Sequence, residues 1–186
     1  MRSKFFNYGG IAAAVVLIAF GIGSLITGIN GRAEVRDTLK KEQIVGTPDM
    51  AASIANKPVD TGAKAKLFAQ GMRKHALEAT GGLTYSQMGR FLDTNGKPTN
   101  DEKAAAVDPK THKPVENAAR NIWVTETALT TALNTSYFAE SVATFAIVMG
   151  VALLLVGGGF LVLTLRVLRR PAVETAAPLR PAGASA

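Results

Sequence analysis

Two long apolar runs, one near each end of the chain, dominate its hydrophobicity pattern. No charged residue occurs between Lys4 and Arg32, or between Glu140 and Arg166. In an α-helix, about 20 apolar residues span the roughly 30 Å hydrocarbon core of a bilayer, and both runs are longer than that. The alternative, a buried helix of a soluble protein, is usually shorter and interrupted by polar residues. We therefore predict transmembrane helices over 5–31 and 139–165.

A cleaved signal peptide is the main alternative explanation of the first run. Its basic n-region would be Arg2 and Lys4. The apolar run, however, is longer than the about 7–15 residues typical of the hydrophobic region of such a peptide. No Ala-x-Ala cleavage site follows it. We therefore expect the first helix to remain in the mature protein.

The basic residues that flank the two runs predict how the chain is oriented. Short flanks rich in Lys and Arg tend to stay in the cytoplasm, and such residues flank the outer ends of both runs: Arg2, Lys4, Arg166, Arg169 and Arg170. A second basic group, within 32–41, favours the reverse orientation. We expect the flanking residues to anchor a cell-membrane protein with a cytoplasmic N-terminus (1–4), an extracytoplasmic segment (32–138) and a basic, then disordered, cytoplasmic tail (166–186).

Small residues recur along one face of each apolar run. They are Gly10, Ala14, Gly21, Ser24 and Gly28 in the first, and Ala143, Gly150, Gly157 and Thr164 in the second. A seven-residue spacing keeps one face turned toward a neighbouring helix, and small residues let helix backbones approach in lipid. We expect the two helices to pack against each other within one chain or to pair between copies.

The segment between the runs is predicted to be mostly helical. Short helices are expected at "TPDMAASIA", capped by Thr47, and along "DTGAKAKLFAQGMRKHALEATGG", ended by Gly81 and Gly82. An exposed excursion is expected over 93–114, followed by one helix of more than fifty residues from Val115 into the second run. The fold class is then an all-α membrane protein with two transmembrane helices flanking a helical-bundle extracytoplasmic domain. Its expected core residues are Leu67, Phe68, Met72, Phe91, Ile122, Trp123 and Leu129.

Few residues offer catalytic or metal-binding chemistry. The chain has no cysteine and only two histidines. His75, Glu78 and His112 could form a site of two histidines and one carboxylate, as in non-haem iron proteins, but an ordinary solvated helix face and a polar turn explain them better. Asp93, Asn95, Asp101 and Glu102 lack the glycine position of a calcium-binding loop, so capped turns explain them better. We expect no catalytic residues, no metal and no cofactor.

The segments "GGLTYSQMGRF" and "ARNIWVTETALTTALNTSYFAE", set between two apolar runs, resemble small two-span membrane proteins of actinobacteria. The resemblance covers nearly the whole chain and implies envelope location and a helical outer domain. The scattered basic residues do not favour nucleic-acid binding. We expect a non-enzymatic accessory or scaffold protein that binds the lipid bilayer and another membrane protein or itself. The alternatives are a ligand-sensing domain that signals through a separate partner, and a metal-dependent enzyme.

Overall fold

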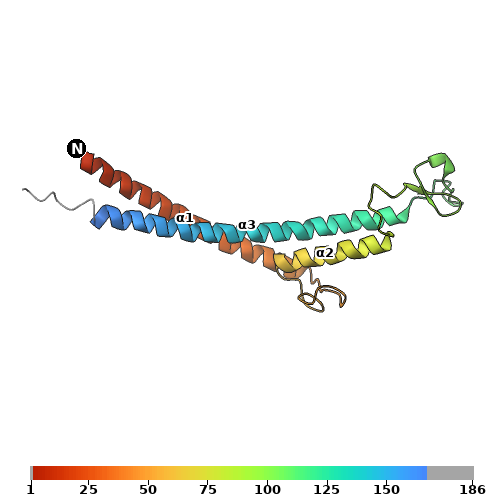
Figure 1. Cartoon of the computed structure of the whole chain (residues 1–186), viewed down its shortest axis with the longest axis horizontal. Helices are drawn as coiled ribbons and strands as arrows, with labels where there is room; N and C mark the ends of the chain where they lie inside the picture. The colour runs from red at the N-terminus through yellow and green to blue at the C-terminus, as the bar shows by residue number, and fades with distance from the viewer. Residues whose placement is uncertain (1, 167–186) are drawn as a thin grey trace, which may run out of the picture. The chain divides into compact units, whose positions relative to one another are not determined.

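The structure, a computed structural model, describes the backbone of residues 2–166 and the side chains of residues 8–166. The described part is mostly helical (Figure 1). Its elements are α1 (Arg2–Lys41), α2 (Gly62–Ala79), β1 (Phe91–Leu92), β2 (Pro98–Thr99), a 3-10 helix η1 (Glu102–Ala104) and α3 (Ala118–Arg166). The two predicted apolar helices are present as α1 and α3, and both are long and apolar enough to cross a membrane.

The chain forms two compact units. The terminal unit comprises Met1–Leu25 and Met149–Ala186, and the central unit comprises Ile26–Val148. The terminal unit therefore contains the outer parts of α1 and α3. The central unit contains α2, the two strands and the remaining parts of the long helices.

In the terminal unit, the small residues of α1 and α3 face each other. A β-carbon added to Gly21 would lie 3.0 Å from the carbonyl oxygen of Gly150, and one added to Gly150 would lie 2.8 Å from that of Gly21. A β-carbon added to Gly157 would lie 3.2 Å from the carbonyl oxygen of Ala14, and one added to Gly10 would meet the side chain of Thr164. The backbones can approach this closely because no side chain separates them. Within one chain, the small-residue faces of α1 and α3 therefore meet each other.

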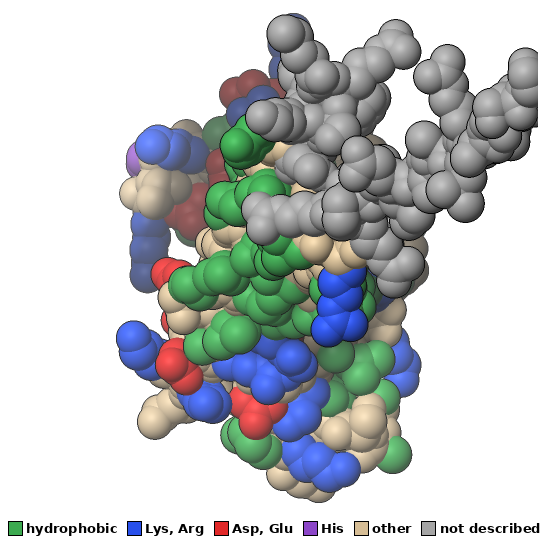
Figure 2. All heavy atoms as spheres, turned by 90° about the vertical axis from the view of Figure 1, so that its left-hand side faces the viewer, with side chains coloured by type: hydrophobic (Ala, Val, Ile, Leu, Met, Phe, Trp, Pro, Cys, Tyr) green, Lys and Arg blue, Asp and Glu red, His purple; other side chains and the backbone are tan. Residues whose placement is uncertain are grey.

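The large apolar side chains of this unit point away from that contact. Phe20 is 69% exposed and Leu155 is 72% exposed. Only 11% of the most apolar window of each long helix is buried. Figure 2 shows hydrophobic side chains gathered in one broad area of the molecular surface. These residues therefore do not form the core of a soluble domain.

The core of the central unit lies where the end of α1, the start of α2 and the middle of α3 meet. It consists of Leu39, Val59, Ala65, Ala69 and Leu133, with Phe68 and Met72 packed against it. Alanines at 65 and 69 recur at the helical spacing of four, so α2 presents a flat face on which a second helix can lie. The core positions α2 alongside α3.

Both ends of α2 follow local capping rules. At the N-terminus the Thr61 hydroxyl accepts a hydrogen bond from the Lys64 backbone N–H at 3.3 Å, as expected of a cap. At the C-terminus Gly81 and Gly82 have φ values of +63° and +80°. Residues with a β-carbon rarely adopt such values, which explains why the helix stops before two glycines.

Two details of the predicted secondary structure are wrong: residues 47–55 are not helical, and α3 begins at Ala118 and not at Val115. Residues 47–55 form turns instead of a helix, held by hydrogen bonds such as Ala55 N–H to Ala51 C=O at 3.0 Å. The region around the predicted excursion contains an antiparallel pair, with Phe91 opposite Thr99 and Leu92 opposite Pro98. An additional bridge joins Asp93 to Ala105 within 93–114. These contacts satisfy backbone groups in a segment that has few apolar side chains to bury.

The face of α3 that is buried also differs from the expected one. Ile122 and Leu129, predicted as core, are 45% and 48% exposed, whereas Leu133 is 6% exposed. A straight helix drifts by about 20° per seven residues relative to a strict heptad pattern. In addition, α2 and the end of α1 pack together around Leu133, so this part of α3 buries the face that carries Leu133.

We predict that Gly21→Ala lowers the thermal unfolding midpoint relative to Gly23→Ala. The added methyl at position 21 would lie 2.9 Å from Leu154 Cγ, whereas nothing lies within 4 Å at position 23. Both substitutions raise helix propensity by about 1 kcal/mol, so their difference isolates an overpacking penalty of about 1–3 kcal/mol. The measurement is circular dichroism on heating. Equal midpoints for the two variants would mean that the close approach of α1 and α3 does not stabilise the chain.

Candidate ligand-binding cleft

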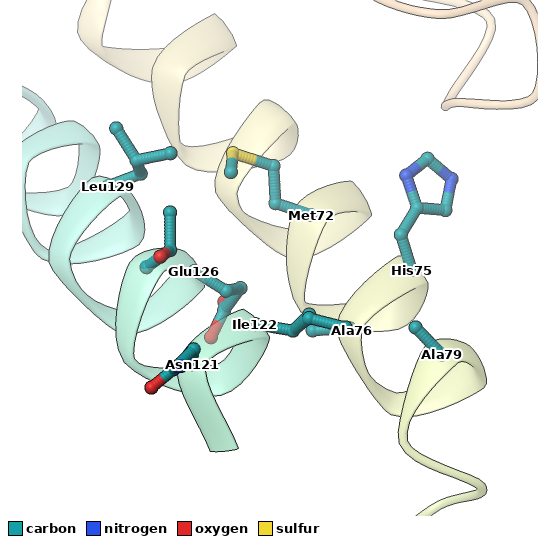
Figure 3. A pocket seen from close by; sticks show the side chains of 9 residues that line it. Met72, His75, Ala76, Ala79, Asn121, Ile122, Glu126 and Leu129 are labelled. Carbon is teal, nitrogen blue, oxygen red and sulfur yellow. The ribbon is translucent and has the colours of Figure 1, made fainter. Parts of the chain in front are cut away.

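An open cleft lies between α2 and α3 in the central unit. One section has a volume of about 560 Å³. Its lining residues come from the two facing helices (Figure 3): Met72, His75, Ala76 and Ala79 of α2, and Asn121, Ile122, Thr125, Glu126 and Leu129 of α3. The small side chains of α2 leave the space open, and the outward-turned Ile122 and Leu129 form its apolar wall.

A second section of about 510 Å³ shares Met72, His75 and Leu129 with the first. Its remaining wall comes from the end of α1, the segment after it, and the facing parts of α2 and α3, including Leu39, Ile44, Met50, Phe68 and Leu133. The two sections adjoin at these three shared residues, and both are lined mainly by apolar side chains. Protein sites for small molecules usually combine such a lining with a few polar groups.

Glu126 is the most deeply buried charged group of this cleft, with 4% of its surface exposed. Its Oε2 lies 3.1 Å from Arg73 Nη1. Its Oε1 is buried and has no hydrogen-bond partner in the described part of the chain. A buried acceptor without a donor costs about 1–3 kcal/mol, and more when it is charged. The cleft therefore contains a carboxylate with one paired oxygen, Oε2, and one oxygen, Oε1, that has no donor in the described part of the chain.

Arg73 connects this carboxylate to the only tryptophan of the chain. The guanidinium carbon of Arg73 lies 4.5 Å from the centre of the Trp123 ring, a cation–π contact. Trp123 was predicted to pack in the outer core, but this contact places its ring against a charged group. The stacking holds Arg73 at Glu126 Oε2, so that Arg73 does not line the cleft.

His75 and Asp49 form a polar pair at the rim. His75 Nε2 lies 2.5 Å from Asp49 Oδ2, and the Thr47 hydroxyl donates to Asp49 Oδ1 at 2.6 Å. The Thr47 hydrogen bond, followed by the one from His75, lowers the pKa of Asp49 to about 2. The pair joins α2 to the segment after α1. The His75 ring points away from Glu126 in Figure 3, so the two do not form an acid–base pair.

A second carboxylate, Glu140, joins the three helices of the central unit. Its Oε1 accepts hydrogen bonds from Arg32 Nε at 3.1 Å and Arg36 Nε at 2.7 Å, both from α1. Its Oε2 accepts from the Gly62 backbone N–H, the first residue of α2, at 2.5 Å. A negative charge is favourable at a helix N-terminus. A β-carbon at Gly62 would lie 2.8 Å from Tyr137 Cα, so this approach requires glycine.

The three weak metal-ligand candidates are not brought together. His75 pairs with Asp49, Glu78 lies 3.7 Å from Lys74, and His112 occupies a turn in which its N–H donates to Asp108 C=O. Asp93 and Asp101 accept backbone N–H bonds from Lys97 and Lys103, as turn and cap residues do. Among the described residues, no group of three or more His, Cys, Asp or Glu could hold a metal ion.

The other predicted site residues have the following positions. Phe91 is 5% exposed, and Leu67 is partly buried. Ser24 is partly buried, and Gly28 packs on Ala143 and Ile147 in the central unit. Arg166 is the exposed last residue of α3. The side chains of Arg2 and Lys4, and the whole of Arg169 and Arg170, lie outside the described residues.

Sequence reasoning missed Glu126, Glu140, Arg73 and Asp49 as functional candidates. One signal was available for the two glutamates. They are fourteen residues apart, with Leu133 halfway between them, so a seven-residue pattern places all three on one face. Two carboxylates on the apolar face of a long helix are unusual because burial of an unpaired charge is unfavourable.

Comparisons with known proteins give no further guidance: no family model, curated protein or solved structure matches this chain.

We predict that Glu140→Gln destabilises the chain by about 1.5–3 kcal/mol, the range for hydrogen bonds to charged groups. The amide would leave Arg32 and Arg36 without an anionic partner. Glu34→Gln, an exposed position on α1, is the matched control and should change little. The measurement is the free energy of unfolding in denaturant. If both variants lose the same small amount, Glu140 does not join the helices.

We predict a pH dependence that originates from Asp49. Because its folded pKa is about 2 against an ordinary 3.8, its contribution to stability is full above pH 3.8 and is lost as the pH falls through 2. The melting midpoint of wild type should therefore exceed that of Asp49→Asn at neutral pH, and the gap should narrow between pH 4 and 2. In Thr47→Val the pKa of Asp49, followed by NMR, should rise toward 3.8. A gap that is constant from pH 7 to pH 2 would contradict the assignment.

Proposed function

We propose that this chain is a two-span integral protein of the cell membrane that acts by binding other molecules and not by catalysis. The observation that carries the proposal is the outward display of large apolar side chains on two helices long enough to cross a bilayer. Lipid offers such side chains an apolar environment, and helices satisfy their backbone groups internally. The spans are then 5–31 and 139–165, and the segment 32–138 forms one domain outside the bilayer.

The pairing of Arg32 and Arg36 supports the orientation with both termini in the cytoplasm. They are two of the four basic residues after the first span, together with Lys40 and Lys41, that favour the reverse orientation. Both arginines are engaged by Glu140, so they serve as helix-to-helix contacts as well as charges. With these two arginines engaged in helix contacts, the basic residues at the outer ends of the spans favour a cytoplasmic location for both termini.

The packing of small residues limits how a partner protein can bind. The stripe of α1 meets that of α3 through Gly21 and Gly150 in the terminal unit, and through Gly28 and Ala143 in the central unit. These faces are thus already used within one chain. We infer that an accessory or scaffold role is carried by the domain over 32–138 and by the outward side chains of the spans.

Ligand sensing is the second candidate function, and the cleft between α2 and α3 favours it. An apolar lining with a buried acceptor at Glu126 is an arrangement expected of a small-molecule site. In that case occupancy would be reported to a separate membrane protein. A metal-dependent enzyme has less support, because His75, Glu78 and His112 each have other neighbours.

We predict that the full chain stays in the membrane pellet after an alkaline carbonate wash. Reporters fused to the N-terminus and to the C-terminus should both be active in the cytoplasm, and one inserted at Gly96, a turn position with φ of +76°, should be active outside. Release of the chain by carbonate would exclude the spans. Reporter activity on opposite sides for the two termini would exclude the two-span topology.

The partner is sought by purification of the full chain in mild detergent, followed by mass spectrometry. An accessory role predicts one membrane protein in stoichiometric amount. The control is a variant with charge reversals at Lys97 and Lys103. Both residues are exposed in the central unit, so the variant should keep the fold. Recovery of the chain with no stoichiometric partner would contradict the accessory role and leave ligand sensing as the favoured function.

A further inference from the structure

The cleft between α2 and α3 carries an inference about ligand class. Among the described residues that line its two sections, the ionisable side chains are those of Glu42, Glu126 and His75, and the first two are acidic. No Lys or Arg lines either section. The cleft is therefore an apolar site with an acidic character, in a chain whose net charge is +7.

Glu126 provides the recognition element. It is 4% exposed, its Oε2 is bound by Arg73, and its Oε1 has no donor in the described chain. Buried polar groups are nearly always hydrogen-bonded, so an orphan carboxylate oxygen indicates a missing donor. A hydrogen bond to an ionised carboxylate is roughly twice as strong as one between two neutral groups, and a cationic donor also brings a positive charge that offsets the buried negative one.

The remaining walls select the rest of the ligand. Met50, Phe68, Met72 and Leu129 line the second section and accommodate an apolar chain. Met72 is common to both sections, and its flexible unbranched side chain can move to admit a head group to Glu126. Arg73 is a nearby cation, but it is held between Glu126 Oε2 and the Trp123 ring, outside the lining.

We propose that this cleft binds a small amphiphilic cation. Its ammonium group donates a hydrogen bond to Glu126 Oε1, and its hydrocarbon chain lies against Met72, Phe68 and Leu129. The site belongs to the central unit alone, so the inference goes beyond the proposed accessory role and does not depend on membrane orientation.

Trp123 makes the proposal directly measurable. It is the only tryptophan, and its ring contacts the arginine that pairs with Glu126. The experiment titrates the full chain, in detergent micelles at pH 7, with hexylammonium, hexanol and hexanoate, which share a chain and differ in head-group charge. We expect a saturable change in Trp123 fluorescence with hexylammonium, at least tenfold tighter than with hexanol, and none with hexanoate.

Three variants locate the site. Glu126→Gln should reduce hexylammonium affinity at least tenfold, whereas Glu78→Gln, which removes an exposed carboxylate on α2 outside the cleft, should not. Ala79→Phe places a ring in the first section from an exposed position and should weaken binding even if Glu126→Gln does not fold. Equal responses to the three probes, or hexylammonium binding that survives both Glu126→Gln and Ala79→Phe, would overturn the proposal. Carbonate extraction is a separate assay, so failure of the ligand site leaves the membrane assignment intact.

Discussion

The Glu140 carboxylate is the interaction on which the arrangement of the central unit depends. It lies just before the apolar run of α3. It accepts hydrogen bonds from two arginines of α1 and from the first N–H of α2. One negative charge thus contacts two cations and the positive end of a helix dipole. The buried carboxylate is well compensated, so it can link three helices without the penalty of an isolated charge.

The cleft follows from this junction. Once the start of α2 is held at Glu140, the alanines at 65 and 69 bring α2 onto the core around Leu133. Further along, α2 and α3 present His75, Ala76 and Ala79 to Asn121 and Ile122, and these side chains do not fill the space between the helices. The result is a cleft whose position is set by the junction and whose polarity is set by Glu126.

The two carboxylates of α3 have different roles although they occupy the same helix face. Glu140 has donors for both oxygens, and its contacts are complete within the chain. Glu126 has a donor for one oxygen only. Complete pairing is typical of a structural residue, whereas incomplete pairing beside an apolar cleft is typical of a residue that meets a ligand. This difference is the reason for proposing a ligand site at Glu126 and not at Glu140.

The sequence by itself determined the two long apolar helices, the matching of their small residues, and the ends of α2. These are local properties: the absence of charge over a run, a period of seven, a threonine cap and a glycine pair act within one or two turns. The tertiary structure alone decided that Ile122 and Leu129 face a cleft while Leu133 is buried, that residues 47–55 form turns, and that Phe91 pairs with Thr99. It also decided the partners of Arg32, Arg73 and Glu126, because ion pairs between helices depend on how the helices pack and not on spacing within one of them. Helix formation is encoded locally, but which face of a helix is buried depends on the other elements that pack against it.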